Sequence, residues 1–175
     1  EQAHEQHEVH RPGESDEQRG THAILMKLAR KAAKIDKVDE AYYQQRIRPM
    51  LSHPLVEYIG EITEQEKDEF LGNAYAVLFP INWPEPFGLV MIEAFACGTP
   101  VITANTSSMP EVAGAAAHLV DPTNVWELLH GINRILTDTT YRELLIEKGL
   151  QQQADFTWEA MAKKVLATYI KLVQH

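Results

Sequence analysis

The sequence predicts an α/β protein built on a doubly wound parallel sheet of the Rossmann-like kind, and two patterns carry this prediction. Residues 75–80, 100–104 and 116–120 are short segments that are apolar almost throughout, which is typical of strands covered on both faces. Segments with a helical spacing of apolar residues, such as 124–138, alternate with them and indicate parallel βαβ units. Such sheets bind ligands beyond the carboxyl ends of their strands, so the loop after residue 80 is a candidate site.

Residues 1–20 are predicted to form an acidic, disordered tail. They contain six acidic and two basic residues, and their only aliphatic side chains are Ala3 and Val9, so they cannot bury a core. Histidines recur there at every third position, but no further ligand completes a metal site, and we interpret them as part of the tail: His4, His7 and His10. The Rossmann-like domain is then expected to span residues 21–175.

The first elements of this domain are less clearly defined by the sequence than the later ones. The pattern of residues 22–34 fits either a helix or a helix that leads into a short strand. Residues 39–51 are predicted to form an amphipathic helix, and residues 55–62 alternate between apolar and polar side chains as a strand does. The buried side of that helix is expected to carry Tyr42, Tyr43, Ile47 and Met50.

The remaining chain is predicted to be helical between the buried strands. Thr63 and Glu66 form a capping box at a helix start, and residues 89–97 form a short buried helix that ends at Gly98. Further amphipathic helices are expected at 124–138 and 141–156. The last helix, 158–173, has an apolar stripe that we interpret as core: Trp158, Met161, Val165, Leu166, Tyr169 and Val173.

Composition excludes several classes of function. The net charge of −9, from 25 acidic and 16 basic residues, argues against a nucleic-acid partner, because phosphate neutralisation needs clustered Lys and Arg. No apolar run approaches the ~20 residues of a membrane helix, and the acidic start lacks the features of a signal peptide. The single cysteine, Cys97, excludes an intrachain disulfide and fits a reducing compartment. The sequence therefore predicts a cytoplasmic protein without a transmembrane segment and leaves its oligomeric state open.

The stretch "INWPEPFGLVMIEAFACGTPVI", residues 81–102, combines an anion site with two carboxylates. A helix begins at Gly88, so the backbone N–H groups of Gly88, Leu89 and Val90 are expected to point at an anion such as phosphate. The flanking prolines restrict the backbone around Glu85 and so fix the direction of its carboxylate.

Glu93 lies one turn inside the same helix, four residues after Leu89. A carboxylate repels phosphate but accepts hydrogen bonds from paired hydroxyls. The set of Glu85, the helix start and Glu93 therefore describes a ligand with an anion in the middle and hydroxyl-rich groups on both sides. A sugar nucleotide is such a ligand.

Three segments of the chain resemble one known family. "PEPFGLVMIEAFACGTPVI" is similar to the E-x7-E signature of the group 1 family of retaining glycosyltransferases, and "SSMPEVAG" and "HLVDP" resemble its next two segments. The resemblance runs from about Lys34 to Tyr169. It implies a GT-B enzyme with two Rossmann-like domains, of which this chain is the C-terminal, donor-binding one. The partner that it implies is an N-terminal acceptor domain.

The resemblance also implies roles for individual residues. Glu85 would contact the transferred sugar as the catalytic residue, and Glu93 would bind the ribose hydroxyls. The substrate would be a UDP- or GDP-linked sugar, transferred to a hydroxyl acceptor without a metal or other cofactor. Backbone N–H groups for the sugar and phosphate would come from Phe87, Gly88, Leu89 and Val90, and the vicinity of the nucleobase from Ile62, Glu64 and Lys67.

The chain departs from the family at the start of the domain, where the first strand and first βα unit are predicted to be atypical or missing. The family has a strand ending in Gly-Arg and then a Lys-Gly, whose cations neutralise the departing diphosphate. The matching segment here, "GESDEQRG", places Glu14 where the Arg is expected and leaves Arg19 as the candidate cation for the diphosphate. The isolated chain is therefore predicted to be inactive. The alternatives are a degenerate nucleotide-binding or interaction module without catalysis, and an epimerase-like enzyme, whose own His and Glu constellation is not found.

Overall fold

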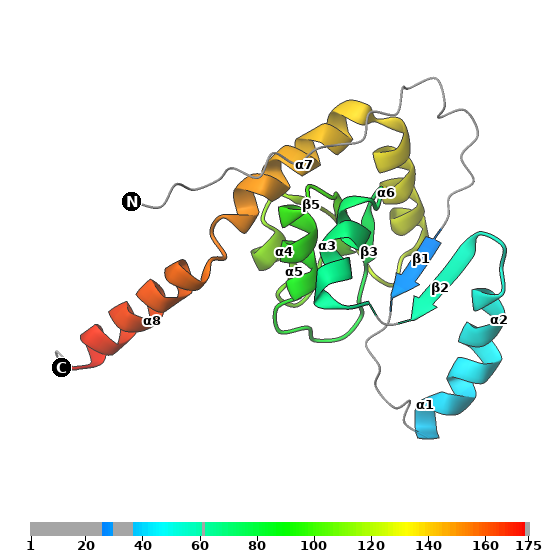
Figure 1. Cartoon of the computed structure of the whole chain (residues 1–175), viewed down its shortest axis with the longest axis horizontal. Coiled ribbons are helices and arrows are strands. Elements are labelled where there is room, and N and C mark those ends of the chain that lie inside the picture. Colours follow the sequence, from blue (N-terminus) through cyan, green and yellow to red (C-terminus); the bar gives the residue numbers. More distant parts are fainter. Residues whose placement is uncertain (1–25, 30–36, 61, 174–175) are drawn as a thin grey trace. The chain divides into compact units, whose positions relative to one another are not determined.

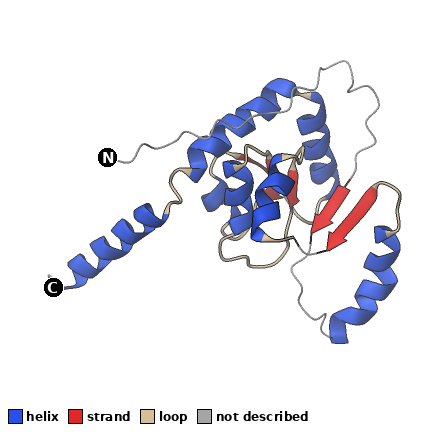
Figure 2. Cartoon of the chain, in the orientation of Figure 1, coloured by secondary structure: helices blue, strands red, loops and turns tan. Residues whose placement is uncertain are grey.

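The structure is a computed structural model that describes residues 26–29, 37–60 and 62–173. It divides between Ile62 and Thr63 into two compact units, which are described separately below. The predicted tail, residues 1–20, lies outside the described residues. Figures 1 and 2 show the helices and strands along the chain.

The first unit contains a pair of parallel strands. Strand β1 (Met26–Ala29) pairs with β2 (Val56–Gly60), with Met26 opposite Val56 and a shift of register after Leu28. The helical connection consists of α1 (Lys37–Tyr42), a π-helical turn η2 (Tyr43–Ile47) and α2 (Arg48–Leu51). Of the two structures left open for residues 22–34, the described part is therefore a strand.

The burial predicted for the helix at 39–51 is only half right. Tyr43 and Ile47 are half-buried, but Tyr42 and Met50 are 62% and 64% exposed. The π-helical turn explains Met50, because a turn with more residues than an α-helical one rotates the following side chains off the original face. Tyr42 lies roughly 100° around the helix axis from Tyr43, at the margin of that face.

The second unit contains a sheet of three parallel strands in the order β3-β4-β5. They are β3 (Val77–Phe79), β4 (Val101–Ala104) and β5 (Ala117–Val120), and Val101 is opposite both Val77 and Ala117. Helix α4 (Leu89–Ala96) connects β3 to β4, and α5 (Met109–Ala113) connects β4 to β5. This arrangement confirms the predicted α/β class with parallel strands.

The helix boundaries of the second unit follow local capping signals. The predicted capping box opens α3 (Glu64–Gly72): the N–H of Thr63 donates to Glu66 Oε2 at 2.8 Å, and the N–H of Glu66 donates to Thr63 Oγ1. Asn124 caps α6 (Val125–Thr137), and Asp138 caps α7 (Thr139–Gln153). Gly98 has a φ of 69° just after α4, as a glycine at a helix end commonly does.

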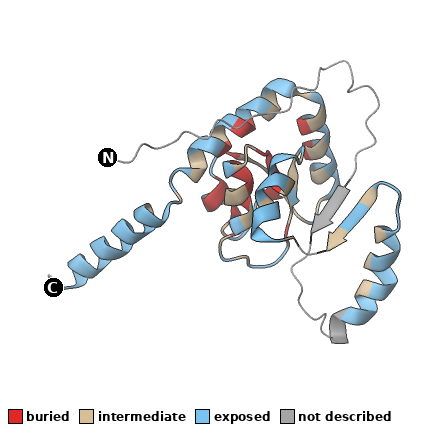
Figure 3. Ribbon diagram, in the orientation of Figure 1, coloured by how far each residue is buried: buried red, intermediate tan, exposed pale blue. Residues whose placement is uncertain are grey.

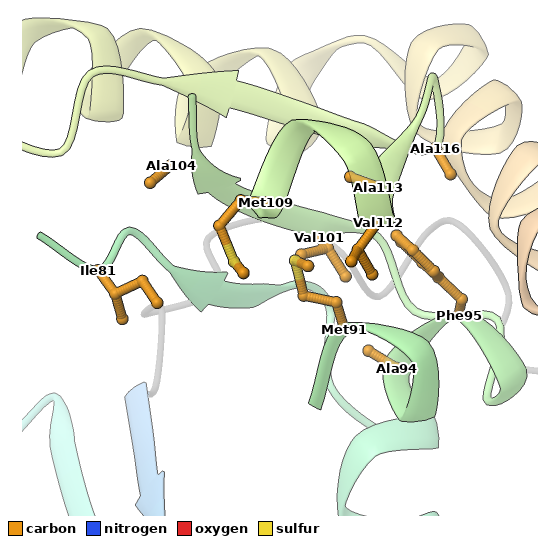
Figure 4. Packing of buried hydrophobic residues seen from close by; sticks show 10 residues of the cluster. All are labelled: Ile81, Met91, Ala94, Phe95, Val101, Ala104, Met109, Val112, Ala113 and Ala116. Carbon is orange, nitrogen blue, oxygen red and sulfur yellow. The ribbon is translucent and has the colours of Figure 1, made fainter. Parts of the chain in front are cut away.

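The core of the second unit lies on both sides of β4, all four residues of which are buried. On one side, Met91, Phe95 and Met109 pack from α4 and α5 against Val101 (Figure 4). A second cluster contains Ile102, Val120, Ile135 and Leu145, from β4, β5, α6 and α7. Burial on both faces explains why the strand is apolar almost throughout.

The interpretation of the last helix as core is wrong for this structure. Helix α8 (Trp158–Val173) has no buried residue, and its surface is exposed along nearly its whole length (Figure 3). Trp158 and Val173, at the two ends of the predicted stripe, are 84% and 85% exposed. An amphipathic pattern indicates that a helix has an apolar face, but not which surface covers that face.

A polar cluster links β5 to α6 and α7. His118 Nδ1 lies 2.8 Å from the hydroxyl of Tyr141, and the Arg134 guanidinium lies 3.6 Å from the centre of the Tyr141 ring. Gly131 lets α6 approach closely, because a Cβ there would lie 2.5 Å from His118 Cδ2. Burial lowers the pKa of His118 from its ordinary value, and the nearby positive charge of Arg134 lowers this pKa further.

We predict that Gly149→Ala destabilises the second unit, although alanine is the better helix former. A Cβ at Gly149 would lie 3.0 Å from Phe95 Cδ1, and Phe95 is fully buried. Overpacking of a core typically costs about 1–3 kcal/mol, which exceeds the ~1 kcal/mol gain in helix propensity. Gly72→Ala in α3 is the matched control, since its Cβ would meet nothing closer than 4.0 Å and should be neutral or stabilising. Urea unfolding measures the free energy of unfolding of both variants. If Gly149→Ala is as stable as Gly72→Ala, the close packing of Gly149 against Phe95 is wrong.

We predict a loss of stability at acid pH that depends on His118. Its pKa is lowered in the folded state, so the unfolded chain binds the proton more readily. The stabilisation is present above the ordinary histidine pKa of about 6.5 and is lost as the pH falls below it. Unfolding free energies from pH 7.5 to 5.5 should therefore fall less steeply in His118→Gln than in the parent. The exposed His130→Gln serves as control; if it flattens the profile as much as His118→Gln does, the assignment is wrong.

Candidate functional site

The candidate site lies where the loops after β3 and β4 meet. Both strands run in the same direction and are neighbours, so their carboxyl ends lie at one edge of the sheet. The hydroxyls of Ser107 and Ser108, after β4, donate to the backbone carbonyl of Glu85, after β3, at 2.8 and 2.7 Å. These two hydrogen bonds fix the backbone of the loop that carries the first signature glutamate.

The side chain of Glu85 is fixed as well. Its Oε2 accepts a hydrogen bond from Trp83 Nε1 at 3.1 Å, and its Oε1 accepts one from the backbone N–H of Gly88 at 3.2 Å. The carboxylate therefore lies at the N-terminus of α4, where the helix dipole favours a negative charge. Glu85 is half-buried, which leaves part of its carboxylate accessible to a ligand.

Gly88 has the conformation that this loop requires. Its φ of 78° lies in the left-handed region, and a Cβ there would lie 3.0 Å from Met109 Cε. Its N–H was expected to face an anion, but in the structure it donates to Glu85. The N–H groups of Leu89 and Val90 follow in the first helical turn, which has no intrahelical acceptors for them. The side chain of Phe87 faces the core and packs edge-on against Phe156, with ring centres 5.5 Å apart.

The second signature glutamate belongs to an ion-pair cluster between α3 and α4. Lys67 Nζ lies 2.7 Å from Glu93 Oε1 and 2.5 Å from Glu64 Oε2. The side chains of Lys67 and Glu93 are 22% and 32% exposed, whereas that of Glu64 is 84% exposed. The hydrogen bonds to Glu64 and then to Glu93 raise the pKa of Lys67, so the ammonium group keeps its charge. The structure thus brings together Glu64, Lys67 and Glu93.

Two other predicted site residues belong to the first unit or lie outside the described residues. Ile62 is half-buried and belongs to the first unit, whereas Glu64 and Lys67 belong to the second. Arg19, the candidate cation for a diphosphate, lies outside the described residues, as does Glu14. Cys97 is half-buried, and burial raises the pKa of its thiol, which disfavours the thiolate that a nucleophile needs.

Sequence reasoning did not foresee the contacts that hold Glu85 in place. They come from Ser107 and Ser108, which open the segment "SSMPEVAG", and from Trp83, for which stacking on a sugar or acceptor and packing of the loop were both open. Ser107 is notable because its φ of 58° is unusual for a residue other than glycine. A signal for both serines was present, since they follow a buried parallel strand that neighbours the one before Glu85. No pattern in the sequence indicated that the indole N–H of Trp83 donates to Glu85, two residues further on.

The described residues contain neither a cluster of metal-ligating side chains nor a membrane-spanning helix. Within residues 26–29, 37–60 and 62–173, no group of three or more His, Cys, Asp or Glu side chains could hold a metal ion. Over the same part of the chain, no helix is both long and apolar enough to span a membrane.

Comparison with known proteins places these features in a family. The family model described as "Glycosyl transferases group 1" matches residues 36–152, which include both signature glutamates. The O-antigen chain mannosyltransferase B of Escherichia coli is 32% identical over 114 residues, which cover 65% of this chain and 30% of that protein. Sucrose-phosphate synthase from Thermosynechococcus elongatus superposes with a TM-score of 0.71 at 30% identity, over 85% of this chain and 38% of that one.

A more distant structure agrees in fold. HepE from Anabaena, solved in complex with UDP, gives a TM-score of 0.72 at 21% identity and covers 85% of this chain and 41% of that one. The chain therefore spans 30–41% of the length of these three proteins. The family model covers well over half of the chain, and the chain belongs to the group 1 family of glycosyl transferases.

Proposed function

We propose that this chain is the donor-binding part of a retaining glycosyltransferase that transfers a hexose from a nucleotide sugar to a hydroxyl acceptor. The observation that carries the proposal is the placement of two oriented carboxylates on either side of the start of α4. Glu85 is oriented at the N-terminus of that helix, and Glu93 is oriented one turn inside it by Lys67.

The start of α4 suits the diphosphate of such a donor. The helix N-terminus carries roughly half a positive charge, and its first N–H groups lack intrahelical acceptors. Leu89 and Val90 would donate to the sugar or phosphate oxygens, together with backbone groups of Phe87 and Gly88. Because the Gly88 N–H donates to Glu85 in the structure, this donor becomes available only if the Glu85 carboxylate turns toward the ligand.

The two carboxylates suit the hydroxyl-rich ends of the donor. Glu85 is assigned to the transferred sugar, where a carboxylate accepts hydrogen bonds from hydroxyls and stabilises positive charge at the sugar carbon as the diphosphate leaves. Glu93 is assigned to the ribose hydroxyls, and Ile62 and Glu64 to the vicinity of the nucleobase. Departure of the diphosphate needs a cation besides the helix dipole, and Arg19 is our candidate for it.

The nucleotide and the rest of the enzyme also belong to the proposal. UDP-glucose and UDP are bound in Anabaena HepE, and several relatives are named as mannosyltransferases, so both UDP- and GDP-linked hexoses are to be tested. An acceptor-binding domain outside these 175 residues would complete the site. We further propose that transfer needs no cofactor and takes place in the cytoplasm, which the single cysteine of the chain favours.

We predict that Glu93→Ala weakens binding of UDP or GDP by about tenfold or more while the fold is retained. The substitution removes the acceptor for the ribose hydroxyls, and a hydrogen bond to a charged group contributes about 1.5–3 kcal/mol. Calorimetric titration measures the affinity, and thermal unfolding checks the fold. Glu143→Ala, at an exposed position of α7, is the matched control. Equal affinities of Glu93→Ala and the parent would refute the role of Glu93.

We predict that this chain alone gives no measurable sugar transfer and at most slow hydrolysis of a nucleotide sugar. Without an acceptor-binding domain nothing orients the attacking hydroxyl, and orientation can contribute about 7 kcal/mol or more to a reaction barrier. Incubation with radiolabelled UDP- and GDP-hexoses and mixed acceptors tests this.

Two results, one from this incubation and one from the calorimetric titration of UDP and GDP, separate the alternatives. Turnover at an ordinary enzyme rate, ~10 s⁻¹, would show that these residues form a complete catalyst. Absence of binding to any nucleoside diphosphate would instead favour a degenerate module, as the acidic segment around Glu14 suggests.

A further inference from the structure

Lys67 is the cation that contacts the second signature glutamate. It projects from the first turns of α3, and its ammonium group lies between Glu93 Oε1 and Glu64 Oε2, at 2.7 and 2.5 Å. The contact to Glu93 spans 26 positions of the sequence, so it is a tertiary contact between two helices. The proposed function uses this contact to orient Glu93 but gives Lys67 no part in the choice of ligand.

The contact orients a side chain that would otherwise rotate freely. A glutamate has several rotatable bonds, and fixing them only when a ligand binds costs about tenfold in affinity. Lys67 fixes Glu93 in advance through Oε1, no hydrogen bond from another described side chain reaches Glu93 Oε2, and the Glu93 side chain is 32% exposed. A carboxylate held by one oxygen can still accept hydroxyl hydrogen bonds at the other.

A second contact holds α3 against α4 independently of Lys67. Thr99, in the turn after α4, donates its buried hydroxyl to the backbone carbonyl of Leu71 in α3 at 2.7 Å. Leu71 is itself buried in the core. Because these contacts do not involve the ion pair, we expect α3 to stay against α4 when the pair is removed.

We infer that Lys67 is a positioning residue, which sets the preference of the site for ribose hydroxyls by holding the carboxylate of Glu93, with Glu64 holding Lys67 from the other side. This inference rests on the proposed binding of a nucleoside diphosphate. Its direct alternative is a contact between Lys67 and the diphosphate itself. The geometry disfavours that alternative, because two carboxylates already bind the ammonium group of Lys67, whose side chain is only 22% exposed. The raised pKa of Lys67, caused by the same two hydrogen bonds, agrees with a structural ion pair.

The experiment compares ribonucleotides with nucleotides that lack the hydroxyls. UDP, GDP and their 2′,3′-dideoxy analogues are titrated calorimetrically into the parent chain, Lys67→Met, Lys67→Arg and the control Lys163→Met. Lys163 is a suitable control because it pairs with Glu159 at 2.6 Å on the exposed helix α8. Thermal unfolding checks each variant, and Lys67→Gln replaces Lys67→Met if the latter does not fold.

We expect Lys67→Met to lose the preference for ribonucleotides over their dideoxy analogues, and not to lose affinity for both kinds of nucleotide equally. The parent and Lys163→Met should prefer the ribonucleotide about tenfold or more, as expected for hydrogen bonds to a charged group. In Lys67→Met the preference should fall below about threefold, with little change for the dideoxy analogue, and Lys67→Arg should restore most of it.

Two results would overturn the inference, and a third would remove its basis. If Lys67→Met keeps the full ribose preference, Lys67 does not position Glu93. If it weakens both nucleotides equally, Lys67 contacts the diphosphate or serves only the fold. If the parent chain binds none of the nucleotides, the proposed function itself fails, and this outcome is distinguishable from the other two because it appears in the parent.

Discussion

The parallel pairing of β3 with β4 is the constraint on which the rest of the candidate site depends. It brings the loop with Glu85 and the loop with Ser107 and Ser108 to the same edge of the sheet, where the serine hydroxyls bond to the Glu85 backbone. Burial of β4 on both faces holds this pairing in place, since its side chains join core clusters on either side of the sheet. The order of the strands therefore determines where the site lies, and the loops after β3 and β4 supply its polar side chains.

The two signature glutamates are held by different physical means. Within the described residues, the Glu85 carboxylate accepts hydrogen bonds from two neutral donors, an indole N–H and a backbone N–H. Its negative charge is therefore stabilised mainly by the dipole of α4. Glu93 instead has a formal cation, Lys67, within hydrogen-bond distance. A carboxylate with neutral neighbours, such as Glu85, is suited to stabilise the positive charge that develops during a reaction. A carboxylate in an ion pair, such as Glu93, is suited to bind hydroxyl groups only.

Much of the fold could be predicted because its signals are local. The capping box at Thr63, the strand at Val101–Ala104 and the helix that follows Gly88 are each set by a few neighbouring residues. The contact of Lys67 with Glu93 could not be read from any local pattern, because it joins two helices across 26 positions. The same limit applies to α8: periodicity showed that the helix has an apolar face, but the interpretation as core assumed a covering surface that the described residues do not supply.

The exposure of α8 has a practical consequence for this chain in solution. The helix is 16 residues long, or roughly 24 Å, and it presents large apolar side chains such as Trp158 and Leu172 to water. Contiguous apolar surface of this kind promotes self-association, which the net charge of −9 opposes by repulsion between molecules. Added salt screens that repulsion and strengthens apolar contacts. Purified samples of these 175 residues should consequently scatter more light as protein and sulfate concentrations rise, and dilute low-salt buffers are the conditions in which they stay dispersed.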